Sequence, residues 1–227
     1  MPNASPSPRR RRTQTERSAE TRGKILAVTL DLVDEVGLRD TTTTLVAERA
    51  GVSRGALLHH FPSKTLLLQE CYRTMLRQAT EDIHAMAVAI DAGDLDIDGF
   101  LDALWEIFSG RVFAVTLEFI TAARTDIDIM TAVRSVASEF NAALDEIWER
   151  FQVRSPLAPA DRRQALTATL CLLRGMGVQY AWRVEPAYFD GLLDFWKNRV
   201  LTAILSPAPA DGQGGDNPVP LRAAGRT

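Results

Sequence analysis

Residues 47–64 read AERAGVSRGALLHHFPSK, and this stretch predicts two short helices separated by a turn. Thr42 is a suitable N-cap for the first helix, and Gly51 is a natural left-handed stop at its end. Ser53 is placed to cap the second helix. That helix should end just before Pro62, because proline disfavours helical geometry in the preceding residue. Two short helices around a tight turn form a helix-turn-helix.

The second helix of this motif should bury one face and expose the other. Leu57 and Phe61 are four residues apart, so we expect both to face inward and hold the helix on the core. In a helix-turn-helix the second helix lies in the major groove of DNA, with its N-terminal residues at the base edges. Arg54 carries a guanidinium fork that reads guanine or clamps a phosphate. The other residues expected at the groove are Ser53, Gly55, Ala56, Leu58, His59 and, near its edge, His60.

The histidine pair allows other roles. His59 and His60 point about 100° apart on a helix, so they cannot chelate one ion from the same face, and no carboxylate cluster accompanies them. A catalytic histidine needs a nucleophile and an orienting acid, and the sequence offers neither. We therefore expect no metal site and no cofactor. Solvated surface histidines are the alternative to DNA contact.

The charge of the chain is unevenly distributed. Residues 1–80 carry 13 Lys and Arg against 8 Asp and Glu, whereas the remainder carries 13 against 21. A basic front half on an acidic body indicates that only the front meets a polyanion. Uneven surface charge without a partner is the alternative.

Composition indicates a soluble protein. No run approaches the roughly 18 apolar residues that a membrane span needs. No apolar stretch follows the arginines at residues 9–12, so we expect no export signal and a cytoplasmic location. Cys71 and Cys171 lack metal or redox spacing, and we expect both to be reduced core residues.

Helical periodicity runs through most of the chain and predicts an all-α fold. The first helix should span residues 16–36 and stop at Gly37. Ser63 should cap a long helix, with Leu66 among the apolar residues on its inner side. RVFAVTLEFITAA, residues 111–123, is apolar nearly all round and should lie inside a bundle. Further helices are expected at residues 97–108, 127–151, 159–182 and 188–205.

TTTTLVAERAGVSRGALLHHFPSKTLLL, residues 41–68, resembles the N-terminal domain of the TetR family of bacterial repressors. The matching features are a Thr pair, an Ala-Gly-Val-Ser turn, Gly-x-Leu, His-Phe, and Ser-Lys before an apolar run. The close likeness covers residues 17–68. The helical body that follows is similar to the family's ligand-binding and dimerising domain in size and pattern only.

The resemblance implies a three-helix DNA-binding domain followed by a helical-bundle domain. Leu58 stands where the family usually has an aromatic residue, most often tyrosine. The missing hydroxyl removes a hydrogen bond to phosphate or base, although leucine can pack on a thymine methyl. The phosphate contacts implied by the resemblance are Thr42, His60 and Lys64. The residues implied to face bases or backbone are Arg54, Gly55, Ala56 and His59.

The aromatic content of the body and the resemblance together suggest a cavity for a small apolar or aromatic effector, with plain core packing as the alternative. Glu118 and Arg174 each sit within an apolar helix segment, where an unpaired charge is costly to bury. They are expected to pair with each other, to contact a ligand, or to point outward. The candidate lining residues are Trp105, Phe108, Phe113, Leu117, Glu118, Phe140, Arg174 and Tyr180.

The last two expected helices suggest a dimer. Small residues such as Gly175 and Gly177 permit close packing in the first of them, and the second carries an apolar stripe that includes Phe195 and Ile204. Two copies of each would form a four-helix interface, as in the family. Packing within one chain is the alternative.

We interpret the chain as a homodimeric repressor that binds a palindromic DNA operator and is released by the effector, with the long helix after Ser63 as the transmitter. A protein of the same fold that answers to a protein partner, or to no ligand, is the alternative. A helical enzyme with an accessory basic domain is a third hypothesis, which the lack of nucleophile–base spacing disfavours. Four domains are expected. Residues 1–14 form a disordered arm, which is either solvated or reaches into the minor groove. Residues 15–62 form the DNA-binding head, residues 63–206 the ligand-binding and dimerising body, and residues 207–227 a disordered tail.

Overall fold

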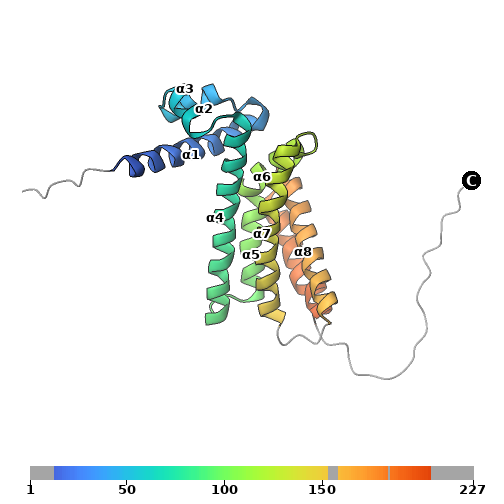
Figure 1. Ribbon diagram of the computed structural model, residues 1–227. Helices are drawn as coiled ribbons and strands as arrows, with labels where there is room; N and C mark the ends of the chain where they lie inside the picture. Colours follow the sequence, from blue (N-terminus) through green and yellow to red (C-terminus); the bar gives the residue numbers. More distant parts are fainter. Residues whose placement is uncertain (1–12, 153–157, 184, 206–227) are drawn as a thin grey trace, which may run out of the picture.

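The computed structural model describes residues 13–152, 158–183 and 185–205, and within these ranges every regular element is a helix. The predicted all-α fold is therefore confirmed. A head made of α1, α2 and α3 lies across one end of an upright bundle (Figure 1). The elements are α1 (Gln14–Asp40), α2 (Thr43–Ala50), α3 (Arg54–His60), α4 (Lys64–Ala92), α5 (Ile97–Ser109), α6 (Arg111–Ala123), α7 (Ile127–Gln152), α8 (Pro159–Tyr180), α9 (Pro186–Phe195), η1 (Trp196–Leu201) and α10 (Thr202–Leu205).

The first helix begins two residues earlier than expected. Thr13 caps it with a full capping box, in which the Thr13 hydroxyl accepts from the Glu16 N–H at 3.2 Å. The Glu16 carboxylate in turn accepts from the Thr13 N–H at 2.7 Å. This Thr-x-x-Glu spacing is a recognised start signal that the expected boundary overlooked. The arm at residues 1–12 and the tail at residues 206–227, both predicted to be disordered, lie outside the described residues.

Gly37 bends the chain as predicted, but α1 continues past it to Asp40. Its φ of 80° and ψ of 164° form a kink that a side chain would strain. Beyond the kink, the N–H and hydroxyl of Thr41 both donate to the Gly37 carbonyl, at 3.2 and 2.8 Å. The bend turns the chain into the helix-turn-helix.

The caps predicted around the turn are confirmed. The hydroxyl oxygens of Thr42, Ser53 and Ser63 each accept a backbone N–H of the helix that follows, at 3.1–3.2 Å. Gly51 ends α2 in the left-handed region, with φ 63° and ψ 36°. Three short-range bonds and one glycine thus set where α2, α3 and α4 start and stop.

The head has its own apolar core beneath α3. Leu57 and Phe61 are buried, as predicted. They pack in one cluster with residues of α1 and α2, and with Leu67 and Cys71 at the start of α4. Because α4 also runs the length of the bundle, it joins the head core to the body core.

The body is built on α4 and α7, which pack along each other, with α5, α6 and α8 completing the bundle. Three expectations about this region were wrong. Leu66 is 47% exposed, and Cys171 is also exposed. Each is rotated about 100° from a buried neighbour, Leu67 or Leu170, so it points away from the core. Ile120 of α6 is exposed as well, because α6 lies at the head end of the bundle and not at its centre.

The sequence predicts one continuous helix at residues 188–205. The segment instead contains a π-helical turn, η1. The Thr202 hydroxyl donates to the Lys197 carbonyl at 2.8 Å, five residues back. The turn directs buried Lys197 onto Asp102 of α5, and the Trp196 indole N–H onto the Thr169 hydroxyl at 3.2 Å. These contacts tie the segment to α5 and α8. None of the described helices is long and apolar enough to cross a membrane.

Gly177 provides a stability test, because α8 approaches α5 closely there. A Cβ at Gly177 would lie 2.2 Å from the Phe108 carbonyl oxygen, whereas a Cβ at Gly23 would meet nothing within 4 Å. We expect Gly177→Ala to lower the free energy of unfolding by about 1–3 kcal/mol through overpacking. Gly23→Ala, the matched control in α1, should raise it by about 1 kcal/mol. Urea unfolding at one protein concentration measures both, and equal stabilisation by the two alanines would contradict the close approach.

Candidate functional site

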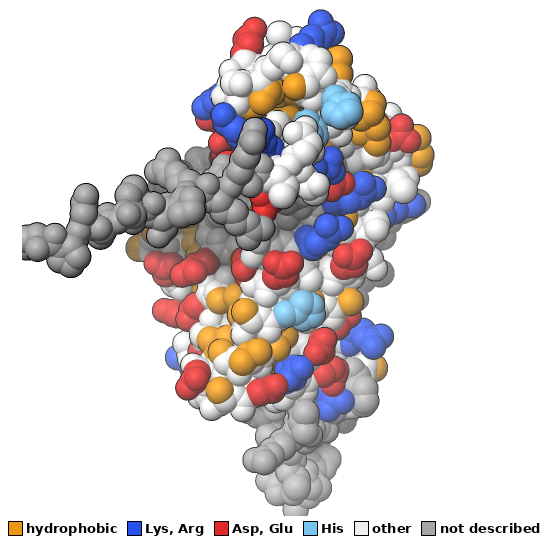
Figure 2. All heavy atoms as spheres, turned by 60° about the vertical axis from the view of Figure 1, so that its left-hand side comes forward, with side chains coloured by type: hydrophobic (Ala, Val, Ile, Leu, Met, Phe, Trp, Pro, Cys, Tyr) orange, Lys and Arg blue, Asp and Glu red, His pale blue; other side chains and the backbone are white. Residues whose placement is uncertain are grey.

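One face of α3 is open to a partner. Arg54, Gly55, Leu58 and His59 are exposed on it, and His60 is half-buried. Figure 2 shows a pale blue histidine at the surface of the head, whereas red Asp and Glu side chains gather over the body. The rings of His59 and His60 lie 5.7 Å apart with their planes inclined by 64°. No group of three or more metal-ligating side chains occurs within the described ranges.

The remaining residues predicted to contact DNA lie at the neighbouring helix starts. Thr42 is exposed before α2, and Lys64 opens α4. The Lys64 ammonium donates to the Arg39 carbonyl at 2.8 Å, so it also ties the end of α1 to α4. Partial burial lowers the pKa of Lys64, while nearby Asp40 acts in the opposite direction. Thr42 and Lys64 thus stand before α2 and at the start of α4, and the other predicted residues lie on α3 or at its N-cap.

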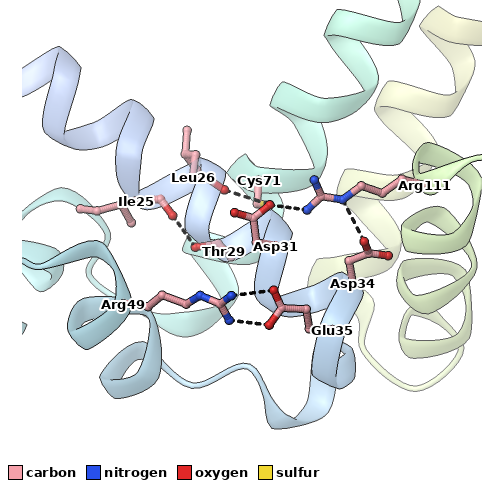
Figure 3. Close-up of polar contacts among 9 residues, drawn as sticks. All are labelled: Ile25, Leu26, Thr29, Asp31, Asp34, Glu35, Arg49, Cys71 and Arg111. Atoms are coloured by element: carbon pink, nitrogen blue, oxygen red, sulfur yellow. Dashed lines mark hydrogen bonds and ion pairs between the residues drawn. The ribbon is translucent and has the colours of Figure 1, made fainter.

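A joint of ion pairs connects the head to α6 (Figure 3). Arg111, the first residue of α6, contacts Asp31 at 2.6 Å and Asp34 at 3.1 Å, both on α1. In the same view, Arg49 of α2 donates to both carboxylate oxygens of Glu35, which holds α2 on α1. No local pattern indicates that Arg111 meets α1, because Asp31 lies 80 residues away in the chain.

Glu118 takes part in the same joint. Its carboxylate accepts from the Leu38 N–H at 3.2 Å, just after the kink, and a Cβ at Gly37 would lie 3.3 Å from it. It is exposed and does not pair with Arg174. Leu117 and Glu118 line a surface hollow between α1 and α6. Of the roles left open for Glu118, the outward orientation is the one observed.

A cavity of about 250 Å³ lies in the body, with walls from α4, α5, α6, α7 and α8. Its lining is mostly apolar, with polar groups from Tyr72, Thr116, Asn141 and Arg174. Four of the eight predicted pocket residues line it. They are Phe108, Phe113, Phe140 and Arg174.

The other four predicted pocket residues lie elsewhere. Trp105 and Tyr180 form an aromatic cluster with Phe189 that joins α5, α8 and α9, with ring centroids 5.4–5.7 Å apart. Leu117 and Glu118 are at the joint with α1. Sequence reasoning missed Tyr72 as a lining residue, although a hydroxyl on the inner stripe of α4 was a usable signal.

The polar lining residues are satisfied to different degrees. Burial raises the pKa of Tyr72, and its hydrogen bond with Thr116 opposes that change. Arg174 donates to the Asn141 side-chain oxygen at 3.0 Å and lies 5.6 Å from the centre of the Phe108 ring. Burial lowers the pKa of Arg174. Among the described residues, the arginine thus contacts neutral groups and no carboxylate.

Comparisons with known proteins agree with this geometry. A family model described as bacterial regulatory proteins, tetR family, matches residues 25–71. The HTH-type transcriptional regulator CymR of Pseudomonas putida is 30% identical over 181 residues, which are 80% of this chain and 89% of CymR.

Two solved structures share the fold. E. coli NemR in its reduced form has a TM-score of 0.66 at 17% identity, over 79% of this chain and 97% of NemR. A protein from Saccharomonospora viridis, in complex with choline, has a TM-score of 0.63 at 20% identity, over 80% of this chain and 97% of that one. The relatives are named as regulators of transcription and not as enzymes.

Cys71 lies beside the joint and offers a test of the packing there (Figure 3). Its thiol is 3.8 Å from the Leu26 carbonyl, and burial raises its pKa to about 12. At pH 8 the thiolate fraction should be on the order of one in ten thousand, against roughly a quarter for a free cysteine. In a Cys171→Ser background we expect native protein to resist maleimide and urea-unfolded protein to react fully. Rapid labelling of the native protein, followed by mass spectrometry, would contradict this burial.

Proposed function

Because the chain belongs to the TetR family of bacterial transcriptional regulators, we propose that it is a repressor whose affinity for its operator is lowered by a small apolar effector. The observation that supports this proposal is that α6 both lines the cavity and holds the head. Val112, Phe113 and Thr116 of this helix line the cavity, while Arg111 and Glu118 of the same helix hold the head. A ligand that moves α6 would therefore act on α1 directly. This adds α6 to α4 as a transmitter.

The proposed DNA contacts are Thr42 before α2, Lys64 at the start of α4, and residues of α3 together with its N-cap, Ser53. The open first turn of α3 and the basic balance of the front half support them. Lys64 keeps two N–H donors for phosphate while its third holds Arg39. The set is Thr42, Ser53, Arg54, Gly55, Ala56, Leu58, His59, His60 and Lys64.

We further propose that the operator-binding form is a homodimer through α8 and the C-terminal segment, since regulators of this family typically bind DNA as dimers. Large apolar side chains are exposed on this side of the chain, among them Val178, Trp182, Phe195 and Ile204. Exposed apolar groups of this size mark surfaces that associate. A four-helix contact between two copies would bury them.

The effector site is proposed to be the cavity, with Phe108, Phe113, Phe140 and Arg174 as lining residues. The choline complex of the Saccharomonospora viridis protein supports a small ligand in this fold, and the apolar walls here favour a more apolar one. Trp105 and Tyr180 support the site from the neighbouring cluster. Leu117 and Glu118 belong to the joint and transmit the effect.

The DNA contacts can be separated by their chemistry. Arg54→Ala should relax discrimination at one base pair of each half-site by about 1–3 kcal/mol. Lys64→Ala should weaken specific and scrambled duplexes alike and reduce the salt slope by about one unit. Fluorescence anisotropy on an operator selected from random DNA, across a salt series, measures both. If the two variants behave alike on both duplexes, this division of roles is wrong.

The joint can be tested through linkage. An effector found by thermal-shift screening should lower operator affinity by roughly 5- to 150-fold, and the operator should weaken effector binding by the same factor. Arg111→Ala should shrink both factors together. It should change the free energy of unfolding by less than about 1 kcal/mol, because exposed ion pairs contribute little.

Arg150→Ala is the matched control for the joint. Arg150 also bridges two carboxylates, Asp91 and Glu146, but it does so far from α1. This variant should leave both linkage factors unchanged. Equal effector affinity for free and operator-bound protein would refute the effector model and favour a regulator that answers to a protein partner or to no ligand.

A further inference from the structure

Arg174 is a cation without a counter-ion on the wall of the cavity. Its guanidinium donates to one neutral amide oxygen, on Asn141, and stands 5.6 Å from the Phe108 ring. Among the described residues no carboxylate lies within 4 Å of it. Burial lowers its pKa, yet an arginine keeps its proton in proteins, so the charge stays in place.

Two other arginines of the body show what is missing here. Arg111 meets two carboxylates of α1, as Figure 3 shows, and Arg150 meets Asp91 and Glu146. Both are paired, although Arg111 is exposed and Arg150 is half-buried, as Arg174 is. A partly buried charge costs free energy unless an opposite charge and hydrogen bonds compensate it. Among the described residues, Arg174 is the arginine that lines the cavity, and its compensation is left to whatever enters there.

The other lining residues restrict the polarity and size of the ligand. Phe108, Phe113 and Phe140 contribute aromatic walls, and aliphatic side chains supply most of the remainder. The Thr116 hydroxyl donates to the Val112 carbonyl of its own helix at 2.7 Å, so its proton is not available to a ligand. An apolar cavity of about 150 Å³ already holds benzene. The 250 Å³ available here fits a single ring with a carboxylate and a short apolar substituent.

We propose that the effector is an aromatic monocarboxylate, with its carboxylate on Arg174 and its ring among Phe108, Phe113 and Phe140. This rests on the proposed function and names the chemical class of its effector. A planar guanidinium pairs with a carboxylate through two parallel N–H donors. Asn141 uses its side-chain oxygen for Arg174, so its NH₂ group is free to donate to the same carboxylate.

The test compares ligands of equal shape and different charge. Isothermal titration at pH 7.5 uses 4-methyl-, 4-ethyl- and 4-tert-butylbenzoate, together with the matching benzamides and benzylamines. We expect at least one acid to bind, and its amide and amine to bind roughly 10- to 100-fold more weakly. If an amide or amine binds as tightly as its acid, or if no acid binds, the proposal is overturned.

Variants assign the selectivity to Arg174. Arg174→Gln should remove the preference for acid over amide, and Arg174→Lys should keep part of it, because the charge remains but the fork is lost. Arg134→Gln, at an exposed arginine of α7, is the matched control and should bind like the parent protein. Circular dichroism and thermal unfolding confirm that each variant is folded. An unchanged preference in Arg174→Gln overturns the proposal.

The proposed function is tested by a separate measurement, in which fluorescence anisotropy follows the release of operator DNA. If the acids release the operator, both stand. If neutral or cationic compounds from a screen release it and the acids do not, the repressor stands and the carboxylate proposal falls. If the acids bind selectively through Arg174 but leave operator affinity unchanged, the carboxylate site stands and effector control of DNA binding falls.

Discussion

Helix α6 has to satisfy two sets of partners at once, and the arrangement of head and body depends on this constraint. Its start and one side hold α1, through Arg111 and Glu118, while another side walls the cavity through Phe113 and Thr116. A helix of 13 residues is about 20 Å long and moves nearly as a rigid rod. Close-packed neighbours cannot absorb such a movement. Under the proposed function, a change of side-chain positions in the cavity would reach α1 through α6.

The joint is weak compared with the core that it borders, and this difference suits a switch. Arg111, Asp31 and Asp34 are all about 40% exposed, and exposed ion pairs contribute roughly 0–1 kcal/mol each. Beneath α3, by contrast, Leu57 and Phe61 are fully removed from water, at about 1.5–3 kcal/mol for a large apolar side chain. The head can thus change its tilt on α6 while its own fold stays intact. A rearrangement of this cost matches couplings of about 1–3 kcal/mol.

Sequence reasoning succeeded where a structure depends on near neighbours and failed where it depends on distant ones. The caps at Thr42, Ser53 and Ser63 involve residues three positions apart, so their spacing is visible in the chain. The hydrogen bond from the Leu38 N–H to Glu118 joins residues that are 80 positions apart, so no local pattern predicts it. The pocket was predicted in part for the same reason: an aromatic residue on an apolar stripe is equally suited to a cavity wall and to a packed cluster. Trp105 lies in the aromatic cluster, and Phe108 lines the cavity.

Glu118 and Arg174 show how far a charge in an apolar segment can be interpreted. Both interrupt apolar helix stretches, and the sequence offers the same set of roles for each. In the fold, Glu118 turns to an exposed joint, where the Leu38 N–H donates to its carboxylate. Arg174 turns to a cavity, where an amide oxygen and the face of the Phe108 ring do not neutralise the guanidinium. The direction of each side chain depends on its position around the helix, where successive residues are about 100° apart. Packing against other helices decides which side of the helix faces the joint or the cavity, and the residue itself does not. An interrupting charge therefore indicates a ligand only once its surroundings and its counter-ions are known.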